Sequence, residues 1–371
     1  MKLLYILAET NDFWSSRLPL ALAAKEKGCE IHLAAPGAAD DLVLKEFGFH
    51  GHDLPQARNG FSIFFAAVKN IFAIKKLLRG LKPHIAHTFT LKYSLLTGLA
   101  ACCSKNTKHV FTIAGLGYLF SGSDMKSKII LCIAAPFLKY ALRRAETVTF
   151  QNSDDMQILT SRNFVRAKNT VLIRGSGVDL QKFSPRSDTE SNPPLILLPT
   201  RLIHDKGISI FIAIAEILKK RQIPARFQVA GGTTEHNPLA ITRLEMERMV
   251  AGSNVEWIGR ADDMPALYAQ ATLIVYPSWY REGIPRVLLE AAACGKAIIT
   301  TDHPGCRDAV IHNETGLLVP VKNAEETADA VEAILKNPAL RKKMESASRA
   351  LAEREFSVDK VVTQTMKVYG F

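Results

Sequence analysis

The chain has 371 residues, of which 47% are hydrophobic and 22% are charged, and its formal net charge is +11. This length favours two globular domains, the composition argues against wholesale disorder, and no apolar run reaches the ~20 residues that a membrane-spanning helix needs. The opening MKLLYILAETNDF contains Glu9 and Asp12, so it predicts a buried strand rather than a signal peptide. Six cysteines without a Cys-x-x-Cys spacing are typical of reduced thiols in a cytoplasmic protein.

The positive charge is concentrated in the first half. Residues 1–183 hold 24 Lys and Arg against 13 Asp and Glu, a balance of +11, and the rest of the chain holds 23 of each. Residues 54–145 contain 14 basic residues and one acidic residue, Asp124. This asymmetry indicates an anionic partner, which could be a membrane surface, a phosphate-bearing acceptor or nucleic acid. Scattered, solvated lysines are the alternative explanation.

Short apolar runs alternate with helical patterns along the whole chain. In the first half, strands are expected at residues 3–7, 30–34, 84–88, 109–113, 147–150 and 170–173. In the second half, they are expected at residues 195–198, 226–230, 255–258, 273–276, 296–300 and 316–320. This alternation predicts an α/β protein with two doubly wound, Rossmann-like parallel sheets that face each other across a ligand-binding cleft.

The domain boundaries follow from composition. The polar, proline-containing segment SPRSDTESNPP at residues 184–194 predicts a linker between a first domain, 1–183, and a second domain, 195–356. A final helix at about residues 357–371 is expected to pack back on the first domain.

The first strand is followed by LAETNDFWSSRLP, which has no glycine, so a dinucleotide-dependent oxidoreductase is disfavoured.

The strand at 273–276 is followed by the sequence PSWYREGIPRVLLE, which predicts a loop and then the start of a helix. Pro285 suits the first helical position, and Gly295 suits the stop after Cys294. The backbone N–H groups of Gly283 and Ile284 would then precede a helix N-terminus, where they could bind an anion or a sugar hydroxyl.

Two glutamates belong to the same segment. Glu282 would stand at the mouth of the cleft, and Glu290 would lie inside an apolar helix. A carboxylate at that depth needs a hydrogen-bonding partner, which could be a pair of ligand hydroxyls or an internal arginine.

A second loop, PTRLIHDKG, follows the strand at 195–198 and precedes a helix at 208–219. It carries Arg201 and Lys206. A planar guanidinium and a compact ammonium suit a diphosphate leaving group, so no metal is needed there. No Asp-x-Asp stands in a loop that could hold Mg²⁺.

These motifs, with GSGVD at 175–179, TDHPGCRDAV and NETGLLVP, resemble the retaining glycosyltransferases of family 4, which have the two-domain GT-B fold. The resemblance implies that Arg201 and Lys206 hold the donor diphosphate. It also implies that Glu282 grips the donor sugar together with the backbone of Gly283 and Ile284. No cofactor is implied.

The resemblance assigns Glu290 to the ribose hydroxyls and places the base near Ile258 and Arg260. One departure is notable. Many members of the family have a histidine beside the donor sugar where this chain has Ala114. A histidine-assisted mechanism is therefore in doubt here, and His87 is considered as an alternative.

The segments SSRLPL (15–20), HTFTLKYSLLTGLAA (87–101), AGLGYLF (114–120) and TFQNSDD (149–155) are similar to a bacterial subgroup that elongates undecaprenyl-diphosphate-linked sugars. This similarity implies a UDP-linked hexose or N-acetylhexosamine as donor and a lipid-linked sugar as acceptor. It also implies a part in the synthesis of capsule, O-antigen or a related glycan.

The acceptor side is expected on the first domain. Arg17, Lys92 and His87 are candidates there for contacts with the acceptor. The apolar runs 61–68 and 129–138, flanked by basic residues, could seat shallowly on an anionic leaflet, although both could equally be interior helices. We therefore expect a cytoplasmic protein that associates peripherally with the inner membrane.

Other functions are compatible with parts of the sequence. A nucleotide-sugar epimerase would need acid and base residues in the cleft instead of the two glutamates. A nucleic-acid-binding protein would need aromatic residues interleaved with arginine, whereas the aromatics at 61–65 form an apolar block. A plain two-domain binding protein would leave Arg201, Lys206, Glu282 and Glu290 unexplained. The sequence thus favours the transferase and no nucleic-acid partner.

Overall fold

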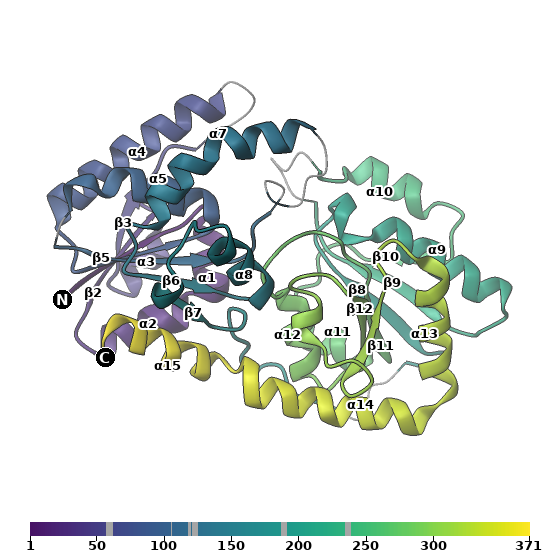
Figure 1. Ribbon diagram of the computed structural model, residues 1–371. Coiled ribbons are helices and arrows are strands. Elements are labelled where there is room, and N and C mark those ends of the chain that lie inside the picture. The colour runs from purple at the N-terminus through teal and green to yellow at the C-terminus, as the bar shows by residue number, and fades with distance from the viewer. Residues whose placement is uncertain (57–61, 105, 118–119, 121–124, 187–190, 234–238) are drawn as a thin grey trace. The chain divides into compact units, whose positions relative to one another are not determined.

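The computed structural model describes residues 1–371 apart from 57–61, 105, 118–119, 121–124, 187–190 and 234–238. The side chains of residues 62–64, 103 and 126–128 are also outside the description. The chain forms two compact units (Figure 1). The first comprises Met1–Ser176 and Asp359–Phe371, and the second comprises Gly177–Val358.

The first unit is built on a seven-stranded parallel sheet in the order β3-β2-β1-β4-β5-β6-β7. Its strands are β1 (Lys2–Ile6), β2 (Glu30–Ala35), β3 (His50–Asp53), β4 (Ile85–Phe89), β5 (Lys108–Ile113), β6 (Thr147–Phe150) and β7 (Thr170–Leu172). Its helices are α1 (Thr10–Ser16), α2 (Leu18–Glu26), α3 (Leu42–Glu46), α4 (Ser62–Leu81), α5 (Leu91–Ala100), α7 (Met125–Leu142), α8 (Ser153–Ser161) and, after the second unit, α15 (Val358–Tyr369).

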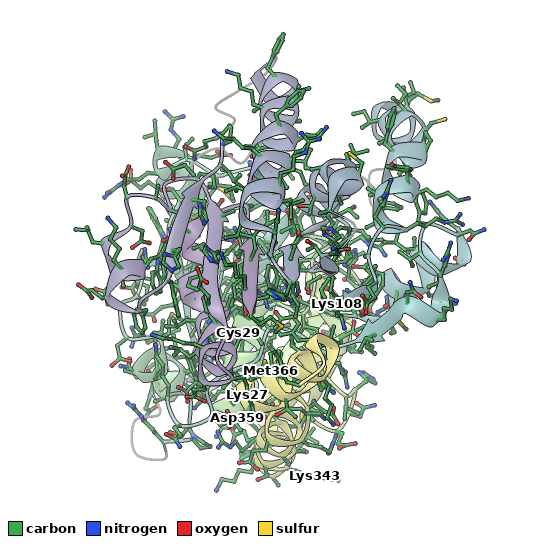
Figure 2. All side chains as sticks on the ribbon, turned by 90° about the vertical axis from the view of Figure 1, so that its left-hand side faces the viewer. Lys27, Cys29, Lys108, Lys343, Asp359 and Met366 are labelled. Carbon is green, nitrogen blue, oxygen red and sulfur yellow. The ribbon has the colours of Figure 1, made fainter. Side chains whose placement is uncertain are left out.

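Both faces of this sheet are buried, because side chains alternate along a strand. On β1, Leu3 and Tyr5 pack in a cluster that includes Met366 and Tyr369 of α15. Figure 2 shows Met366 near Cys29, another residue of that cluster. Leu4 of β1 points to the opposite face and packs with residues of α4 and α5.

The second unit has a six-stranded parallel sheet in the order β10-β9-β8-β11-β12-β13. Its strands are β8 (Leu195–Pro199), β9 (Arg226–Ala230), β10 (Val255–Trp257), β11 (Leu273–Tyr276), β12 (Ile298–Thr301) and β13 (Gly316–Val319). Its helices are α9 (Ile208–Lys220), α10 (Arg243–Val250), α11 (Met264–Gln270), α12 (Arg286–Ala293), α13 (Ala324–Lys336) and α14 (Pro338–Leu351). A π turn, Ala352–Phe356, follows α14.

The expectation of two doubly wound parallel sheets is confirmed. In each sheet the order of strands reverses direction beside the first strand of the unit, so the loops at the carboxyl ends of neighbouring strands diverge there and leave space for ligands. In the second unit, these are the loops after β8 and β11, which carry Arg201, Lys206 and Glu282.

Candidate functional site

The loop after β8 brings Lys206 into the interior of the second unit. Residues His204–Lys206 form a short 3-10 turn, and Gly207 follows with a φ of 81° before α9 begins. A Cβ at Gly207 would lie 2.2 Å from the carbonyl oxygen of Pro277. Glycine is thus required for this loop to approach the loop after β11.

The Lys206 side chain is only 3% exposed, and its charge is neutralised locally. Its Nζ donates a hydrogen bond of 2.7 Å to the hydroxyl of Tyr276, the last residue of β11, and pairs with Oε1 of Glu282. The Tyr276 hydroxyl donates to the same Oε1 at 3.1 Å. The Lys206 Nζ also lies 5.0 Å from the ring centroid of Tyr280, within the range of a cation–π interaction. Lysine, tyrosine and glutamate therefore form one closed triangle.

Burial explains the protonation of the tyrosines. Burial and the nearby Glu282 charge raise the pKa of Tyr276 well above its ordinary value. The pKa of Tyr280 is raised for the same reasons. Both hydroxyls therefore keep their protons near neutral pH, and Tyr276 can act as a hydrogen-bond donor to Glu282.

Further contacts fix the two loops against each other. The indole Nε1 of Trp279 donates to Oδ1 of Asp205 at 2.9 Å, and the Trp279 backbone N–H donates to the Asp205 carbonyl at 2.9 Å. Ser278 is fully buried, and its hydroxyl contacts the same Asp205 carbonyl at 3.2 Å. This network holds Glu282 in place beside Lys206.

The segment that precedes α12 differs in one detail from the expectation. Pro285 was expected at the first helical position, but it is the N-cap residue, and the helix begins at Arg286. The ψ of Pro285 is 125°, which is extended rather than helical. Gly283 and Ile284, which are both buried, precede the helix as expected.

Glu290 has two partners inside the second unit. Its Oε2 accepts from the Tyr268 hydroxyl at 3.2 Å, and its Oε1 accepts from Arg286 at 3.4 Å. Burial raises the pKa of this carboxyl group even though Arg286 and the Tyr268 hydrogen bond act in the other direction. The sequence left an internal arginine open as the partner of Glu290; an arginine partner is present, but it lies one turn earlier on the same helix and its side chain is 39% exposed. Its contact is long, so a ligand could replace it.

Arg201 is exposed next to the triangle. Its charge opposes the rise in the pKa of Tyr276 and Tyr280, but burial and Glu282 outweigh it. Among the described residues, its side chain has no hydrogen-bond partner. The loop after β8 thus offers one buried and one exposed cation.

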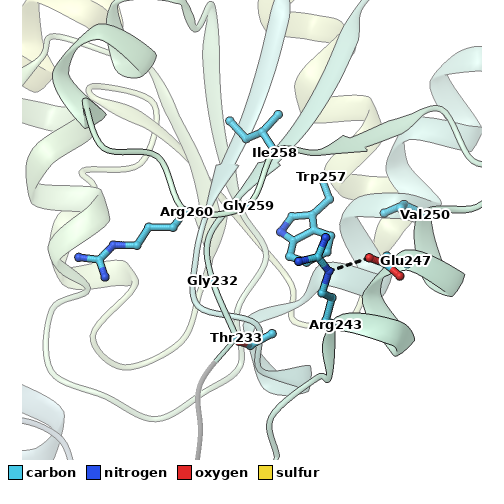
Figure 3. A pocket seen from close by; sticks show the side chains of 9 residues that line it. All are labelled: Gly232, Thr233, Arg243, Glu247, Val250, Trp257, Ile258, Gly259 and Arg260. Atoms are coloured by element: carbon cyan, nitrogen blue, oxygen red, sulfur yellow. Dashed lines mark hydrogen bonds and ion pairs between the residues drawn. The ribbon is translucent and has the colours of Figure 1, made fainter.

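The residues Ile258 and Arg260, predicted to lie near the base, line a pocket of about 570 Å³ (Figure 3). The pocket lies beyond the carboxyl ends of β9 and β10. Trp257 also lines it and donates from Nε1 to the Gly231 carbonyl at 2.8 Å. The opposite wall is α10, where Arg243 pairs with Glu247 at 2.9 Å.

In the first unit, Arg17 and Lys92 lie at the carboxyl end of β4. The Arg17 guanidinium stacks 4.3 Å from the ring centroid of Phe89, the last residue of β4. Lys92 is exposed in the first turn of α5, which begins two residues after that strand. The structure therefore brings both candidate cations to one edge of the sheet.

His87 is placed differently. It is 1% exposed, Nδ1 contacts the Tyr369 hydroxyl at 2.5 Å, and Nε2 contacts Thr112 Oγ1 at 2.6 Å. Burial and the Arg17 charge hold the pKa of His87 well below its ordinary value, so the ring is neutral. Both nitrogens are used inside the first unit, and contact with an acceptor would require these bonds to break. An acceptor-side role for His87 stays a prediction.

Sequence reasoning missed Tyr276 and Gly305. In the sequence, Tyr276 fits the pattern of an apolar strand residue, and the one signal for a role in the site is its position just before PSWYREG. Gly305 has a φ of 86°, and a Cβ there would lie 2.2 Å from the Gly283 carbonyl oxygen. The TDHPGC loop therefore packs directly on the segment that presents Gly283.

Comparison with known proteins agrees with this arrangement. Residues 2–152 match the family described as glycosyl transferase 4-like, and residues 180–351 match the family described as glycosyl transferases group 1. The fold is that of sucrose-phosphate synthase from Thermosynechococcus elongatus, with a TM-score of 0.81 at 22% identity over 100% of this chain and 98% of that one. The chain belongs to the glycosyltransferases with the GT-B fold. The enzyme is also similar in structure to Anabaena HepE in complex with UDP, with a TM-score of 0.75 at 17% identity, covering 100% of both chains.

Two curated relatives span nearly the whole enzyme. One is the Campylobacter jejuni N,N'-diacetylbacillosaminyl-diphospho-undecaprenol alpha-1,3-N-acetylgalactosaminyltransferase, 26% identical over 88% of this chain and 87% of the relative. The other is the Staphylococcus aureus capsular polysaccharide biosynthesis glycosyltransferase CapM, 24% identical over 93% of this chain and 91% of the relative. Both names agree with a glycosyltransferase of bacterial glycan synthesis.

Proposed function

We propose that the enzyme transfers a hexose or N-acetylhexosamine from a UDP-linked donor to a lipid-linked sugar, retaining the anomeric configuration and using no metal. The observation that carries the proposal is the buried Lys206–Tyr276–Glu282 triangle beside the exposed Arg201. Support for a lipid-linked acceptor comes from the name of the C. jejuni relative.

The chemistry follows from where charge develops. When the bond between the anomeric carbon and the diphosphate breaks, negative charge grows on the leaving oxygen. Arg201 and Lys206 supply two fixed positive charges to that group, so a divalent cation is not required. Glu282 and the N–H groups of Gly283 and Ile284 would bind the sugar hydroxyls, and Glu290 the ribose.

The same geometry also fixes the position of the Lys206 cation before the donor binds. Before the donor binds, Glu282 already compensates the lysine charge, and the Tyr276 hydroxyl holds both side chains in position. The cation therefore does not need to reorganise when the leaving group becomes charged, which is the condition under which electrostatic stabilisation is most effective.

The test is a panel of UDP- and GDP-sugars, each incubated with polyprenyl-diphosphate-linked sugar acceptors and followed by nucleotide release. Lys206→Ala should lose nearly all turnover, whereas Lys219→Ala, an exposed lysine in the last turn of α9, should keep it. EDTA should leave the rate nearly unchanged, and proton NMR of the product should show the donor's anomeric configuration. Turnover without an acceptor, Mg²⁺-dependent turnover or an inverted product would each refute the corresponding part.

We further propose that the first unit docks on an anionic membrane surface. Helix α4 presents a stripe of exposed aromatic and basic residues at helical spacing: Phe65, Lys69, Phe72, Lys76 and Arg79. Helix α7 presents a second, apolar stripe: Met125, Ile129, Ile133, Phe137 and Tyr140. Phe61 and the side chains of Phe64, Lys126 and Lys128, part of the same expectation, lie outside the description.

Both stripes belong to one layer, because α4 and α7 each pack against α5. Figure 1 shows these three helices together in the first unit. Exposed apolar residues suit the headgroup boundary, and each basic residue near an anionic leaflet adds ~1 kcal/mol of attraction. Lys75, Lys76 and Arg79 also line a shallow depression of about 500 Å³ together with Phe72. No helix among the described residues is long and apolar enough to cross a membrane.

Liposome sedimentation tests this docking. The enzyme should sediment with vesicles that contain anionic lipid at low salt, and roughly molar salt should release most of it. Replacing Lys75, Lys76 and Arg79 together with glutamine should weaken sedimentation, whereas replacing Lys219, Lys220 and Arg248 of the second unit should not. Equal binding to neutral vesicles, or no effect of the first triple variant, would contradict the electrostatic docking.

A further inference from the structure

Three histidines and a glutamate cluster at the edge of the first sheet, at the opposite end of the strands from the loops described above. Glu30 and His32 lie near the start of β2, and His50 and His52 lie in the edge strand β3. The parallel register pairs His32 with His50. Because side chains alternate, residues 30 and 32 of β2 and residues 50 and 52 of β3 project from the same face.

The contacts within this cluster are close. Nε2 of His32 lies 2.9 Å from Oε1 of Glu30, and Nε2 of His50 lies 3.7 Å from the same oxygen. The rings of His32 and His50 are stacked with centroids 4.7 Å apart. One possible ligand atom from each of Glu30, His32 and His50 lies within 4.8 Å of the others.

We propose that Glu30, His32 and His50 form a zinc-binding site that clips the edge strand β3 to β2. Two imidazole nitrogens and a carboxylate oxygen are a donor set that Zn²⁺ prefers, and three protein ligands leave the fourth tetrahedral position to water. Among the described residues, this is the one group of three or more His, Cys, Asp or Glu side chains whose ligand atoms approach one another in this way.

The distances are close to those of a bound state. Two donor atoms on a tetrahedral zinc ion lie ~3.3 Å apart when each bond is ~2.0 Å. The Glu30–His32 pair is already near that value, and His50 has room to adjust because its side chain is 55% exposed. The Glu30 side chain is 45% exposed, so the ion can enter from solvent.

His52 completes the arrangement as an outer partner. Its Nε2 lies 3.0 Å from Nδ1 of His32, the nitrogen that points away from Glu30. When Nε2 of His32 binds the ion, its proton can reside on Nδ1 and be donated to His52, which fixes the tautomer that a ligand histidine needs.

A metal ion at this place would stabilise an edge strand that has few other contacts. Strand β3 has the sequence HGHD and contributes no apolar side chain to the core, so little holds it except its backbone bonds to β2. A metal that bridges His50 on β3 to Glu30 and His32 on β2 would stabilise this edge. Within the first unit, Glu30 and His50 begin β2 and β3, whereas the acceptor-side candidates lie at the carboxyl end of β4. A metal here would therefore act on stability and not on the chemical step.

The experiment uses the full chain stripped of metal. Titration with Zn²⁺ against a chromophoric chelator should show one tight site, with Mg²⁺ and Ca²⁺ failing to compete because they prefer oxygen ligands. His50→Ala and Glu30→Gln should each weaken binding at least tenfold. His204→Ala is the matched control, because His204 pairs with one glutamate, Glu245, at 3.2 Å in the second unit, and no third possible ligand joins this pair among the residues that the structure describes.

Two readouts of the fold accompany the titration. Zinc should raise the melting temperature of the parent by several degrees and slow hydrogen exchange at the amides of β3, and neither effect should occur in His50→Ala. His50 is exposed, so its replacement should not prevent folding. Parent affinity no tighter than that of His50→Ala, or an equal loss in His204→Ala, would overturn the proposal.

Discussion

The Lys206–Glu282 pair allows the sharpest test of how the second unit holds the residues proposed to bind the donor. The two side chains are 3% and 20% exposed, so their removal is not equivalent. Lys206→Met leaves a partly solvated carboxylate that still accepts from Tyr276, and we expect a loss of about 2 kcal/mol in the free energy of unfolding. Glu282→Gln leaves a buried ammonium, and we expect about 3 kcal/mol.

The double variant separates stability from catalysis. With both charges removed, no isolated charge remains, and we expect a total loss of about 2 kcal/mol, which corresponds to a coupling energy of about 3 kcal/mol. Turnover should not recover, because the cation proposed to stabilise the leaving group is gone. Each single variant and the double variant should lose about 10²–10³-fold in rate.

The assay is urea unfolding of the full chain for the four forms, followed by nucleotide release under identical conditions. A matched cycle on Arg243 and Glu247, which form an exposed pair one turn apart on α10, should give a coupling energy below about 0.5 kcal/mol. Additive losses at Lys206 and Glu282, or full activity in either single variant, would refute the idea that the pair is one buried unit at the donor site.

Three further predictions concern single residues of the second unit. Arg201→Ala should lower the rate about 10²–10³-fold without changing the melting temperature, because the side chain is exposed; an unchanged rate would remove Arg201 from the donor site. Glu290→Gln should raise the donor KM yet stabilise the apoprotein at neutral pH. The raised pKa of Glu290 means that the folded state disfavours its carboxylate, so the free energy of unfolding falls as the pH rises through that pKa. Glutamine does not titrate, so the variant should lose this pH dependence, which thermal melts from pH 4 to 8 measure. Gly305→Ala should destabilise by more than about 2 kcal/mol because its Cβ meets a carbonyl oxygen, whereas Gly252→Ala, with a φ of 73° and open space, should cost about 1 kcal/mol in the same urea assay.

The strands that sequence patterns predicted are those with apolar side chains. The runs at 195–198 and 273–276 fall in β8 and β11, because the central strands of a doubly covered parallel sheet are apolar on both faces. Strand β3, His50–Asp53, was not predicted. It is an edge strand of alternating polar residues and glycine, and its pairing with β2 depends on backbone bonds that leave no hydrophobic signal.

The candidate site shows the same division between local and long-range information. The sequence alone identified residues 201, 206, 282 and 290 as candidates, because each belongs to a local motif that follows a strand. The contact between Lys206 and Glu282 could not be predicted, since the residues are 76 positions apart and meet only when β8 and β11 pair. Tyr276 joins them for the same reason. The N-cap position of Pro285 differs by one residue from the expectation, because helix ends depend on the local ψ rather than on residue type.

The triangle also explains why a lysine so well buried is compatible with a stable fold. Burying an ammonium without a partner in this position would cost several kcal/mol, but Glu282 pairs with it, the Tyr276 hydroxyl accepts a hydrogen bond from it, and the Tyr280 ring faces it. The free energy that orders these groups is therefore supplied when the chain folds, not when the donor binds. A diphosphate that reaches Lys206 would meet a cation whose position is already set. In this view the strength of the site lies in its preorganisation, and variants that keep the charge but lose Tyr276 should retain donor binding better than they retain turnover.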